Sequence, residues 1–396
     1  MKTACSRHLT DNYNVTLTIC AILLFICTNP YFVWRTPLIL LSSWLVCLLS
    51  YKYFTINNIH IVTFLAFFVL YSIYAVINEV NFFGAAELLI IPFLFLLKKD
   101  YISDLYNRFI LILSIALVPS ILEYLLWLLG FSINYNVIAP YELGKTYNYQ
   151  QFLFFVTSYS PFGLSRFYSY YDEPGVLGTI TAMILISKQY NLRSRQNIII
   201  FVAGILTFSF YFYAISLLAF LFSNIKHKYL WAGLVLILVF GVTKIDFFEP
   251  LVNRFIIEDG KFAGDNRTNE DYDIWFSNYL QTDRVWYGYG KNYAQDLNKG
   301  GTSYKDIIVN FGLLFFIIYV SSFVLLCLRT LKRKRDRFLW IILFFSCLYQ
   351  RPSIGRVEFV FIWLSSMYVI GMVDDLQISN KRLDKVLFKT KKLIHQ

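Results

Sequence analysis

Charged side chains are scarce in this chain. They make up 15% of its 396 residues, whereas hydrophobic residues make up 57%. Soluble globular domains carry a larger charged fraction, so this composition excludes a soluble enzyme or binding domain. Histidine is also scarce, with four in the whole chain, and no polar segment has the ligand spacing of a metal site. The sequence therefore predicts an integral membrane protein with no metal and no other cofactor.

Cysteine is missing from the long polar segments. All six cysteines are predicted to lie in the cytoplasm or within the membrane, so no disulfide is expected outside the cytoplasm. They are Cys5, Cys20, Cys27, Cys47, Cys327 and Cys347. The first hydrophobic block also lacks a small-residue cleavage site and is interrupted by Pro30. It is therefore not expected to be a cleavable signal peptide.

Hydrophobic residues come in blocks that could cross a hydrocarbon layer about 30 Å thick. The blocks are residues 15–34, 36–50, 59–77, 84–97, 107–130, 174–187, 229–244, 306–328, 338–350 and 357–373. A further apolar run, 197–223, is too long for one crossing and predicts a helical hairpin that turns near Ser209–Tyr213. Together the blocks predict an all-α fold, a single polytopic membrane domain over residues 1–396 with about twelve transmembrane helices, several of them short.

Positive charge gathers in short segments between these blocks. If 197–223 crosses twice, all of these segments fall on one side, and the positive-inside rule places both termini in the cytoplasm. The basic tail 374–396 lies on that side too. The net charge of +11 follows mostly from this topology. It does not indicate nucleic-acid binding, which would need a solvated basic domain.

Two connections on the opposite side are long, residues 131–173 and 246–305. Polar residues gather in them, whereas channels and secondary transporters usually concentrate polar residues inside their helices. The working surface is therefore expected on the extracytoplasmic face, where no nucleotide donor is available. An enzyme on that face needs a substrate that carries its own activation.

The most informative stretch of the sequence is residues 166–186, RFYSYYDEPGVLGTITAMILI. It places Arg166, Asp172 and Glu173 at the edge of a membrane helix, where polar groups are functional candidates by default. A simpler and compatible interpretation makes Asp172 or Glu173 the N-cap, with Pro174 as the first helical residue. Glu173 is the first candidate for a general base and Asp172 the second, because desolvation can raise a carboxyl pKa. An ion pair with Arg166 would lower the pKa instead.

Arginines in the outer loops are the candidate anion-binding residues, because a guanidinium grips a phosphate through two parallel hydrogen bonds. For each of them the alternative is an ordinary surface ion pair. Two lie in the short connection 351–356, against the positive-inside bias, which predicts a compensating anion: a carboxylate such as Glu358 or a substrate phosphate. The candidates are Arg166, Arg254, Arg284, Arg351 and Arg356.

The second long loop holds two aromatic features. Its residues 272–280 have aromatic and apolar side chains at helical spacing on one face, which predicts a short amphipathic helix lying on the membrane surface. Trp286, Tyr287 and Tyr289 then alternate with two glycines in a compact turn. Their rings are candidates for stacking on sugars, the alternative being an interfacial aromatic belt.

Three stretches together resemble the O-antigen polymerases of the Wzy type and, more loosely, the O-antigen ligases. They are RFYSYYDEPGVLGTI at 166–180, LTFSFYFYAISLLAFLF at 206–222 and GYGKNYAQDLNKGGTSYKDIIVNFGLLFFIIYV at 288–320. The second is similar to the family's Thr-x-Ser turn, with Phe210 where an arginine often stands. Ligases usually have a histidine where this chain has Thr302 and Ser303, which favours a polymerase. Arg284 and Gly300 match an Arg–Gly spacing of some polymerase loops.

The resemblance implies a glycosyltransferase of the bacterial cytoplasmic (inner) membrane. Such an enzyme polymerises undecaprenyl-pyrophosphate-linked oligosaccharide repeat units into O-antigen or capsule-type polysaccharide on the outer face. Its donor and acceptor are both lipid-linked, and a chain-length regulator is an expected partner. The alternatives are a ligase or a lipid-linked oligosaccharide flippase. A flippase would need polar residues lining a cavity across both leaflets, and the two long outer loops argue against it.

Overall fold

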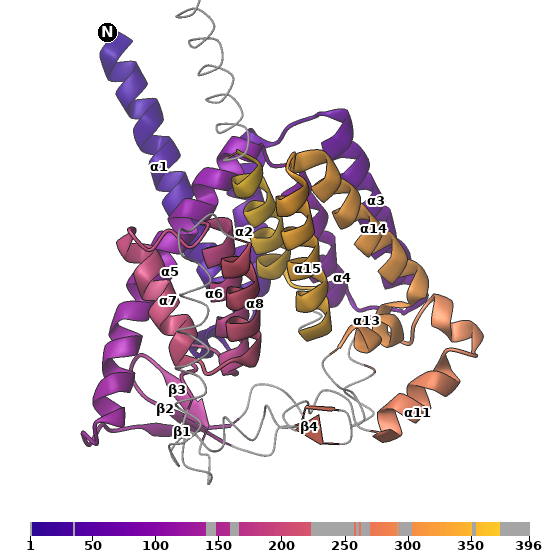
Figure 1. The fold of residues 1–396 in the computed structure, drawn as a ribbon. Coiled ribbons are helices and arrows are strands. Elements are labelled where there is room, and N and C mark those ends of the chain that lie inside the picture. The colour runs from indigo at the N-terminus through magenta and orange to yellow at the C-terminus, as the bar shows by residue number, and fades with distance from the viewer. Residues whose placement is uncertain are drawn as a thin grey trace, which may run out of the picture.

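A computed structural model describes residues 2–34, 36–139, 148–158, 166–222, 257–258, 261–262, 270–290, 293, 303–350 and 354–372. These residues are mainly helical (Figure 1). The longer helices are α1 (Lys2–Cys27), α2 (Leu38–Ser50), α3 (Asn58–Ile77), α5 (Lys99–Leu128), α6 (Pro174–Ser187), α7 (Arg195–Leu206), α8 (Phe210–Leu221), α11 (Glu270–Tyr279), α14 (Leu313–Thr330) and α15 (Lys334–Gln350). The last apolar helix runs over Val357–Met372.

Shorter elements connect these helices. They are α4 (Phe82–Leu89), α13 (Tyr304–Phe311) and the 3-10 helices η1 (Tyr31–Val33), η2 (Tyr51–Tyr53), η3 (Ile91–Leu96) and η6 (Asp283–Trp286). The first long loop holds an antiparallel sheet in the order β1 (Asn136–Ile138), β2 (Tyr149–Gln151) and β3 (Val156–Ser158). The second holds the pair β4 (Ile257–Glu258) and β5 (Lys261–Phe262). The all-α prediction is thus confirmed for the bundle, and the small sheets in the loops are additions to it.

Within the described residues, three helices are long and apolar enough to cross a membrane: His60–Ile77, Lys99–Leu128 and Leu313–Thr330. Seven further apolar helices are shorter. Apolar side chains are also exposed along the outside of the bundle, for example Val62 (66%) on α3 and Leu122 (58%) on α5. Exposed apolar surface of this extent is expected where lipid rather than water covers the protein. The structure therefore indicates a membrane protein.

The predicted hairpin over 197–223 is present as α7 and α8. Its turn lies at Thr207–Ser209, slightly before the predicted position. Gly204 allows the two arms to pack, because a Cβ there would stand 2.2 Å from the Phe212 ring. Each arm has 12 residues and is therefore about 18 Å long.

Three predicted blocks are not single helices. In block 15–34, α1 ends at Cys27 and η1 follows Pro30. Block 84–97 divides into α4 and η3, because Pro92 in the first turn of η3 lacks the N–H that a continuous α-helix would need. Block 306–328 divides into α13 and α14 at Gly312, whose φ of 89° breaks the helix. Asp306 consequently lies outside the long apolar helix. The predicted block 229–244 and the tail 374–396 lie outside the described residues.

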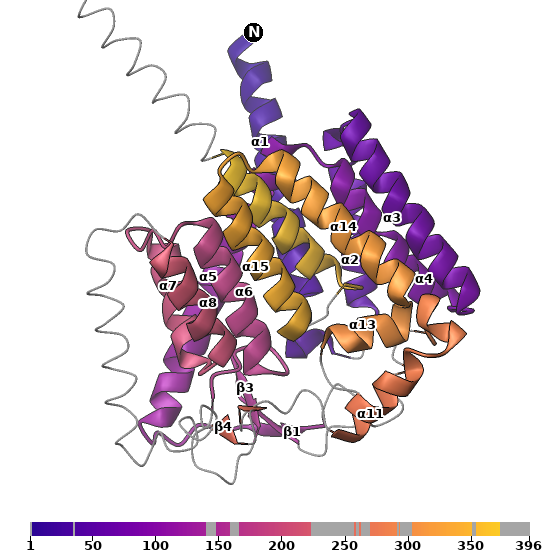
Figure 2. The ribbon, with the colours of Figure 1, turned by 45° about the vertical axis from the view of Figure 1, so that its right-hand side comes forward.

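The described parts of the two long loops lie at the same end of the bundle. In both views the start of α1 lies at one end, while β1–β3, α11 and α13 lie at the opposite end (Figures 1 and 2). We call the latter the loop end. The helices α6 and Val357–Met372 both begin there and run through the middle of the bundle. All fourteen residues of α6 are buried, so its first residues are covered by protein on all sides.

Candidate functional site

The segment with the predicted base, residues 166–173, is fixed by its backbone at the loop end. Residues 167–172 are all buried. The backbone is hydrogen-bonded to the end of α7, to β3 and to η1. These bonds are Phe167 N to Leu206 O (3.1 Å), Val156 N to Ser169 O (2.8 Å) and Tyr31 N to Tyr170 O (2.7 Å). The segment is therefore part of the packed core rather than a surface loop.

Side-chain hydrogen bonds fix the same segment from further elements. Tyr170 Oη donates to Ala116 O of α5 (2.9 Å), and Tyr149 Oη of β2 donates to Asp172 O (2.9 Å). The Tyr171 hydroxyl lies 3.2 Å from Thr28 Oγ1 at the end of α1. These hydrogen bonds hold the segment in place, and a preorganised site requires its groups to be held in place.

The hairpin turn of α7 and α8 packs directly against this segment. Arg166 Nε donates to Thr207 O (2.9 Å). Gly178 on α6 makes room for the turn, because a Cβ there would stand 2.7 Å from Ser209 Cβ. Thus two of the three stretches that carry the family resemblance, far apart in the sequence, lie in contact at the loop end.

Two of the six described non-glycine residues with a positive φ lie at this contact. Ser169 has a φ of 53°, and Phe208 in the hairpin turn has a φ of 47°. Side chains other than glycine rarely adopt this left-handed conformation, which costs of order 1–3 kcal/mol per residue and recurs at functional sites. The surrounding hydrogen bonds hold both residues in it.

The two candidate carboxylates stand at the start of α6. Glu173 occupies the N-cap position with an extended backbone (φ −143°, ψ 139°), and Pro174 is the first helical residue, as predicted. However, the Glu173 side chain makes no capping hydrogen bond. Asp172 is 7% exposed, whereas Glu173 is half-buried. Glu173 is therefore the more accessible of the two and is not used as a cap.

A second charged group lies where the last helix begins. Arg356 Nη1 is 3.9 Å from Glu358 Oε1, so Glu358, one of the two predicted compensating anions, lies within ion-pair distance of it. The Glu358 carboxylate is also close enough to the Tyr171 phenol to interact with it electrostatically. The start of the last helix and the segment 166–173 are thus neighbours. The candidates Arg254 and Arg351 lie outside the described residues.

Helix α11 is present as predicted, but its aromatic face is not on a membrane surface. Phe276 and Tyr279 are buried in a cluster with Val285 of η6 and with Ile308 and Val309 of α13. The periodicity correctly predicted an amphipathic helix. The covering partner is α13 rather than lipid, so the surface-helix prediction is wrong on this point.

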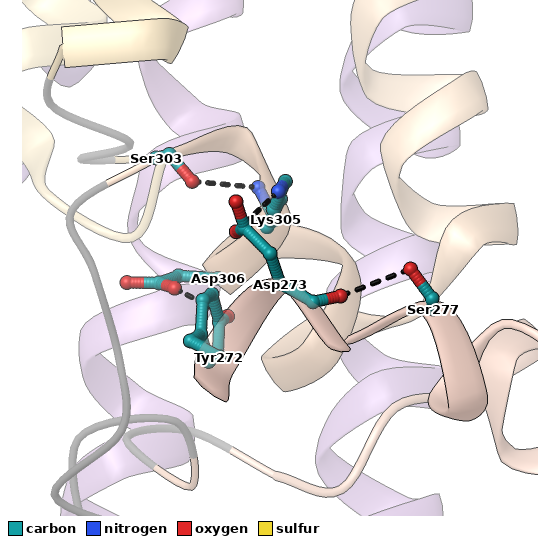
Figure 3. A network of polar contacts seen from close by, with 6 residues as sticks. All are labelled: Tyr272, Asp273, Ser277, Ser303, Lys305 and Asp306. Carbon is teal, nitrogen blue, oxygen red and sulfur yellow. Dashed lines mark hydrogen bonds and ion pairs between the residues drawn. The ribbon is translucent and has the colours of Figure 1, made fainter. Parts of the chain in front are cut away.

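A polar network joins α11 to the start of α13 (Figure 3). Tyr272 Oη donates to Asp306 Oδ1 (2.6 Å), and Lys305 Nζ forms an ion pair with Asp273 Oδ1 (2.7 Å). Ser303 is the N-cap of α13, and its Oγ accepts a hydrogen bond from Lys305 N (3.3 Å). The two helices therefore form one unit through both apolar and polar contacts.

Asp306 is the group in this network that the sequence analysis missed. It is 2% exposed, and its Oδ2 has no hydrogen-bond partner. Burial raises the pKa of the Asp306 carboxyl to about 7, while the Tyr272 hydrogen bond acts in the opposite direction. The Ser303-x-x-Asp306 spacing, typical of a helix start, was a signal that could have drawn attention to it.

The predicted glycine turn docks on the junction of α13 and α14. Tyr289 N donates to Val309 O (2.8 Å), and Gly290 N donates to Asn310 O (3.1 Å). Gly312 has a φ of 89°, and a Cβ there would stand 2.4 Å from Trp286 O. Only glycine allows the two backbones to approach this closely.

The aromatic candidates of this turn differ in exposure. Trp286 and Tyr287 are each 49% exposed. The Tyr289 ring stacks on Tyr293 with centroids 4.4 Å apart, and the Arg284 guanidinium lies 6.0 Å from the Tyr289 centroid. Because protein groups already contact the Tyr289 ring, Trp286 and Tyr287 are better placed than Tyr289 to stack on a ligand.

The predicted site is therefore divided between two units at the loop end. Arg166, Asp172 and Glu173 belong to the unit formed by α6, the α7–α8 hairpin and the sheet, with Arg356 at the neighbouring helix start. Arg284 and the aromatic turn belong to the α11–α13 unit, which lies on the α3 side (Figures 1 and 2).

The chain has no match among protein-family models, curated proteins or solved structures. The resemblance to polymerases therefore depends on the three quoted stretches. Two of them meet in the structure, and the described part of the third forms the glycine turn, α13 and the start of α14. The geometry offers a carboxylate and two arginines at the head of two buried helices, an arrangement suited to proton transfer beside an anionic group.

Proposed function

We propose that this chain is a membrane glycosyltransferase that joins undecaprenyl-pyrophosphate-linked oligosaccharide repeat units into O-antigen or capsule-type polysaccharide. The observation that carries the proposal is the segment 166–173, buried over 167–172, which brings an arginine and two carboxylates to the first turn of the buried helix α6. In this proposal the enzyme uses neither a metal nor a nucleotide, because the glycosyl pyrophosphate is already activated.

The proposed orientation has about twelve crossings in the bacterial cytoplasmic membrane, with both termini in the cytoplasm and the loop end outside. The described parts of both long loops lie at one end, opposite the start of α1 (Figure 1), which supports this orientation. The α7–α8 turn reaches the loop end at Arg166, as a double crossing of residues 197–223 requires.

In the proposed reaction an acceptor sugar hydroxyl attacks the anomeric carbon of the donor. The new C–O bond forms as the bond from that carbon to the pyrophosphate oxygen breaks. The hydroxyl proton passes to the Glu173 carboxylate, and the bonding electron pair leaves with undecaprenyl pyrophosphate. Glu173 is assigned this role because it is half-buried and does not cap α6. Asp172 is the second candidate.

The arginines are proposed to stabilise the charge that grows on the leaving pyrophosphate. Preorganised donors are effective there because they need no rearrangement during the reaction. Arg166 is held by Thr207 O and Arg356 lies beside Glu358. The N-termini of α6 and of the last helix add partial positive charge at the same end. Arg254, Arg284 and Arg351 are further candidates, and Trp286 and Tyr287 are candidates for holding sugar rings.

The proposal is tested in a strain that lacks this chain, complemented with wild type, Glu173→Gln or Glu79→Gln. Glu79 is an exposed carboxylate at the end of α3 and serves as the control. We expect single-repeat glycan in the deletion strain and a ladder with wild type and Glu79→Gln. Glu173→Gln should restore no ladder at a wild-type level of membrane protein.

Each alternative has its own outcome in this experiment. A ladder that persists in the deletion strain would refute the polymerase. Loss of outward-facing lipid-linked units would indicate a flippase, and loss of all polymer attachment with free polymer retained would indicate a ligase. A normal ladder with Glu173→Gln would remove Glu173 from the mechanism while leaving the polymerase in place. A chain-length regulator is proposed as a partner on the resemblance alone.

A further inference from the structure

We infer that Glu358 is a positioning residue that orients the Arg356 guanidinium toward the pyrophosphate of the donor. This inference rests on the proposed function and extends it to a residue that no stretch of the family resemblance contains. Glu358 acts through Arg356 and does not itself contact the substrate. The basis of the inference is the placement of a buried carboxylate beside a more exposed arginine at the loop end.

The burial of the two side chains differs sharply. The Glu358 side chain is 4% exposed, whereas the Arg356 side chain is 34% exposed. Glu358 Oε1 has no hydrogen-bond partner. Within the part of the chain that the structure describes, Arg356 is the cation at ion-pair distance from it. The ion pair thus consists of a buried carboxylate and a partly exposed guanidinium at the loop end.

The backbone around Arg356 is fixed on both sides. Ile354 O accepts a hydrogen bond from Tyr71 Oη of α3 (2.8 Å). Gly355 lies against Leu88 of α4: a Cβ added to Gly355 would stand 3.4 Å from Leu88 Cδ2. Arg356 O accepts the first hydrogen bond of the last helix, from Val360 N (3.3 Å). The Arg356 side chain extends from this fixed backbone, and Glu358 lies at ion-pair distance from its guanidinium, where it can orient it.

The length of the ion pair suggests how it works. At 3.9 Å the Nη1–Oε1 distance exceeds that of a hydrogen bond, which is at most about 3.2 Å for N–H to O. Catalytic contacts are often long without substrate and shorten in the complex. A buried ion pair contributes little net stability compared with apolar packing, so stability alone does not explain this pair. Orientation of Arg356 toward an anion does.

The neighbours of Glu358 connect it to the other half of the site. Its carboxylate interacts electrostatically with the Tyr171 phenol and with the Cys27 thiol at the end of α1. Tyr171 in turn contacts Thr28 and directly precedes the candidate carboxylates. Arg356 and Glu173 therefore stand on neighbouring elements, as a reaction needs when one group accepts a proton and another stabilises the leaving group.

The charge balance predicts a specific kinetic effect for Glu358→Gln. Removing the carboxylate makes the surroundings of Arg356 more positive, so binding of the anionic donor should not weaken. Without Glu358, however, the guanidinium is no longer oriented toward the leaving group, whose negative charge develops in the transition state. An interaction made mainly in the transition state lowers kcat without raising KM when it is lost. We expect kcat to fall at least tenfold and KM to stay constant or fall.

The test uses the purified full chain in nanodiscs, with repeat-unit lipid extracted from cells that lack the chain. The variants are Glu358→Gln, Arg356→Ala, the double variant and the control Glu79→Gln. If Glu358 acts through Arg356, the double variant should be no slower than Arg356→Ala alone. Inorganic pyrophosphate serves as a competing anion: its inhibition constant should rise for Arg356→Ala and not for Glu358→Gln. Thermal melting checks that each variant is folded.

The outcomes separate this inference from the proposed function. If wild type makes no polymer from the extracted lipid, the polymerase itself is refuted and the inference with it. If wild type makes polymer, wild-type kcat in Glu358→Gln overturns the inference alone. Losses that multiply in the double variant also overturn it, because they would mean that the two residues act independently. If Glu358→Gln proves unstable, Glu358→Asp is used, and it should retain more of the wild-type kcat than Arg356→Ala does.

Discussion

The contact between α11 and α13 should weaken as the pH rises. Asp306 is 2% exposed and has a carboxyl pKa of about 7, against 3.8 for a free carboxyl. The Asp306 carboxyl therefore holds its proton more tightly when α11 is packed against α13 (the docked state) than when the two helices are apart (the undocked state). The contribution of the protonated Asp306 to the stability of the docked state is fully present below about pH 4, falls as the pH rises toward 7 and is constant above that. The groups that face Asp306 are Tyr272, its hydrogen-bond donor, and the nearby Asp273–Lys305 pair.

The size of this effect follows from the two pKa values. A rise from 3.8 to about 7 corresponds to about 4 kcal/mol of docking free energy between the protonated and the ionised limits. This is the upper limit of the effect, which applies when undocking exposes the Asp306 carboxyl fully to water. In the Asp306→Asn variant this pH dependence should disappear, since an amide does not titrate.

Hydrogen exchange over residues 270–290 measures the docking. Wild type and Asp306→Asn are compared at the same pH, so that the intrinsic exchange rates cancel. The ratio of their protection should change by up to about a thousandfold between pH 4 and pH 8. Asp273→Asn, which breaks the more exposed ion pair, should keep the wild-type pH profile. A wild-type to Asp306→Asn ratio that stays constant over this range would refute the reasoning.

Three further predictions concern single side chains. Tyr272→Phe removes the donor to Asp306 and should cost about 1–3 kcal/mol of docking, seen in the same exchange experiment. Gly312→Ala places a Cβ 2.4 Å from Trp286 O and should lower the melting temperature far more than Gly130→Ala, which has a similar φ and open space; equal shifts would contradict this. Gly178→Ala should displace the hairpin turn from α6 and reduce polymer at least tenfold, whereas Gly371→Ala, at the other end of the bundle, should leave the glycan ladder intact.

The helices could be predicted largely from the sequence because hydrophobic length defines them. The first helix is shorter than its predicted block 15–34, since α1 ends at Cys27, before Pro30. The block ending at 187 coincides with α6. Blocks 84–97 and 306–328 were wrong as single helices, because hydropathy does not register the missing N–H of Pro92 or the positive φ of Gly312. The count of twelve crossings stays a prediction.

The candidate site could be predicted in composition but not in arrangement. The importance of 166–173 was visible because charges stood beside an apolar block. Its contact with Thr207 spans 41 residues, and no local pattern encodes a contact of that range. Periodicity predicted α11 as amphipathic but could not say whether protein or lipid would cover it. Asp306 was missed because it was counted as the first residue of an apolar block.

The shortness of α6 has a consequence for the depth at which chemistry would occur. Fourteen residues make a helix about 21 Å long, whereas the hydrocarbon layer is about 30 Å thick. In the proposed orientation, with the last turn of α6 at the cytoplasmic boundary, its first turn would lie several ångströms inside the outer boundary. Glu173 and Arg166 would then lie below the level of the lipid phosphates rather than in open water. The sugar would descend to the site while the polyprenyl tail stays in the bilayer.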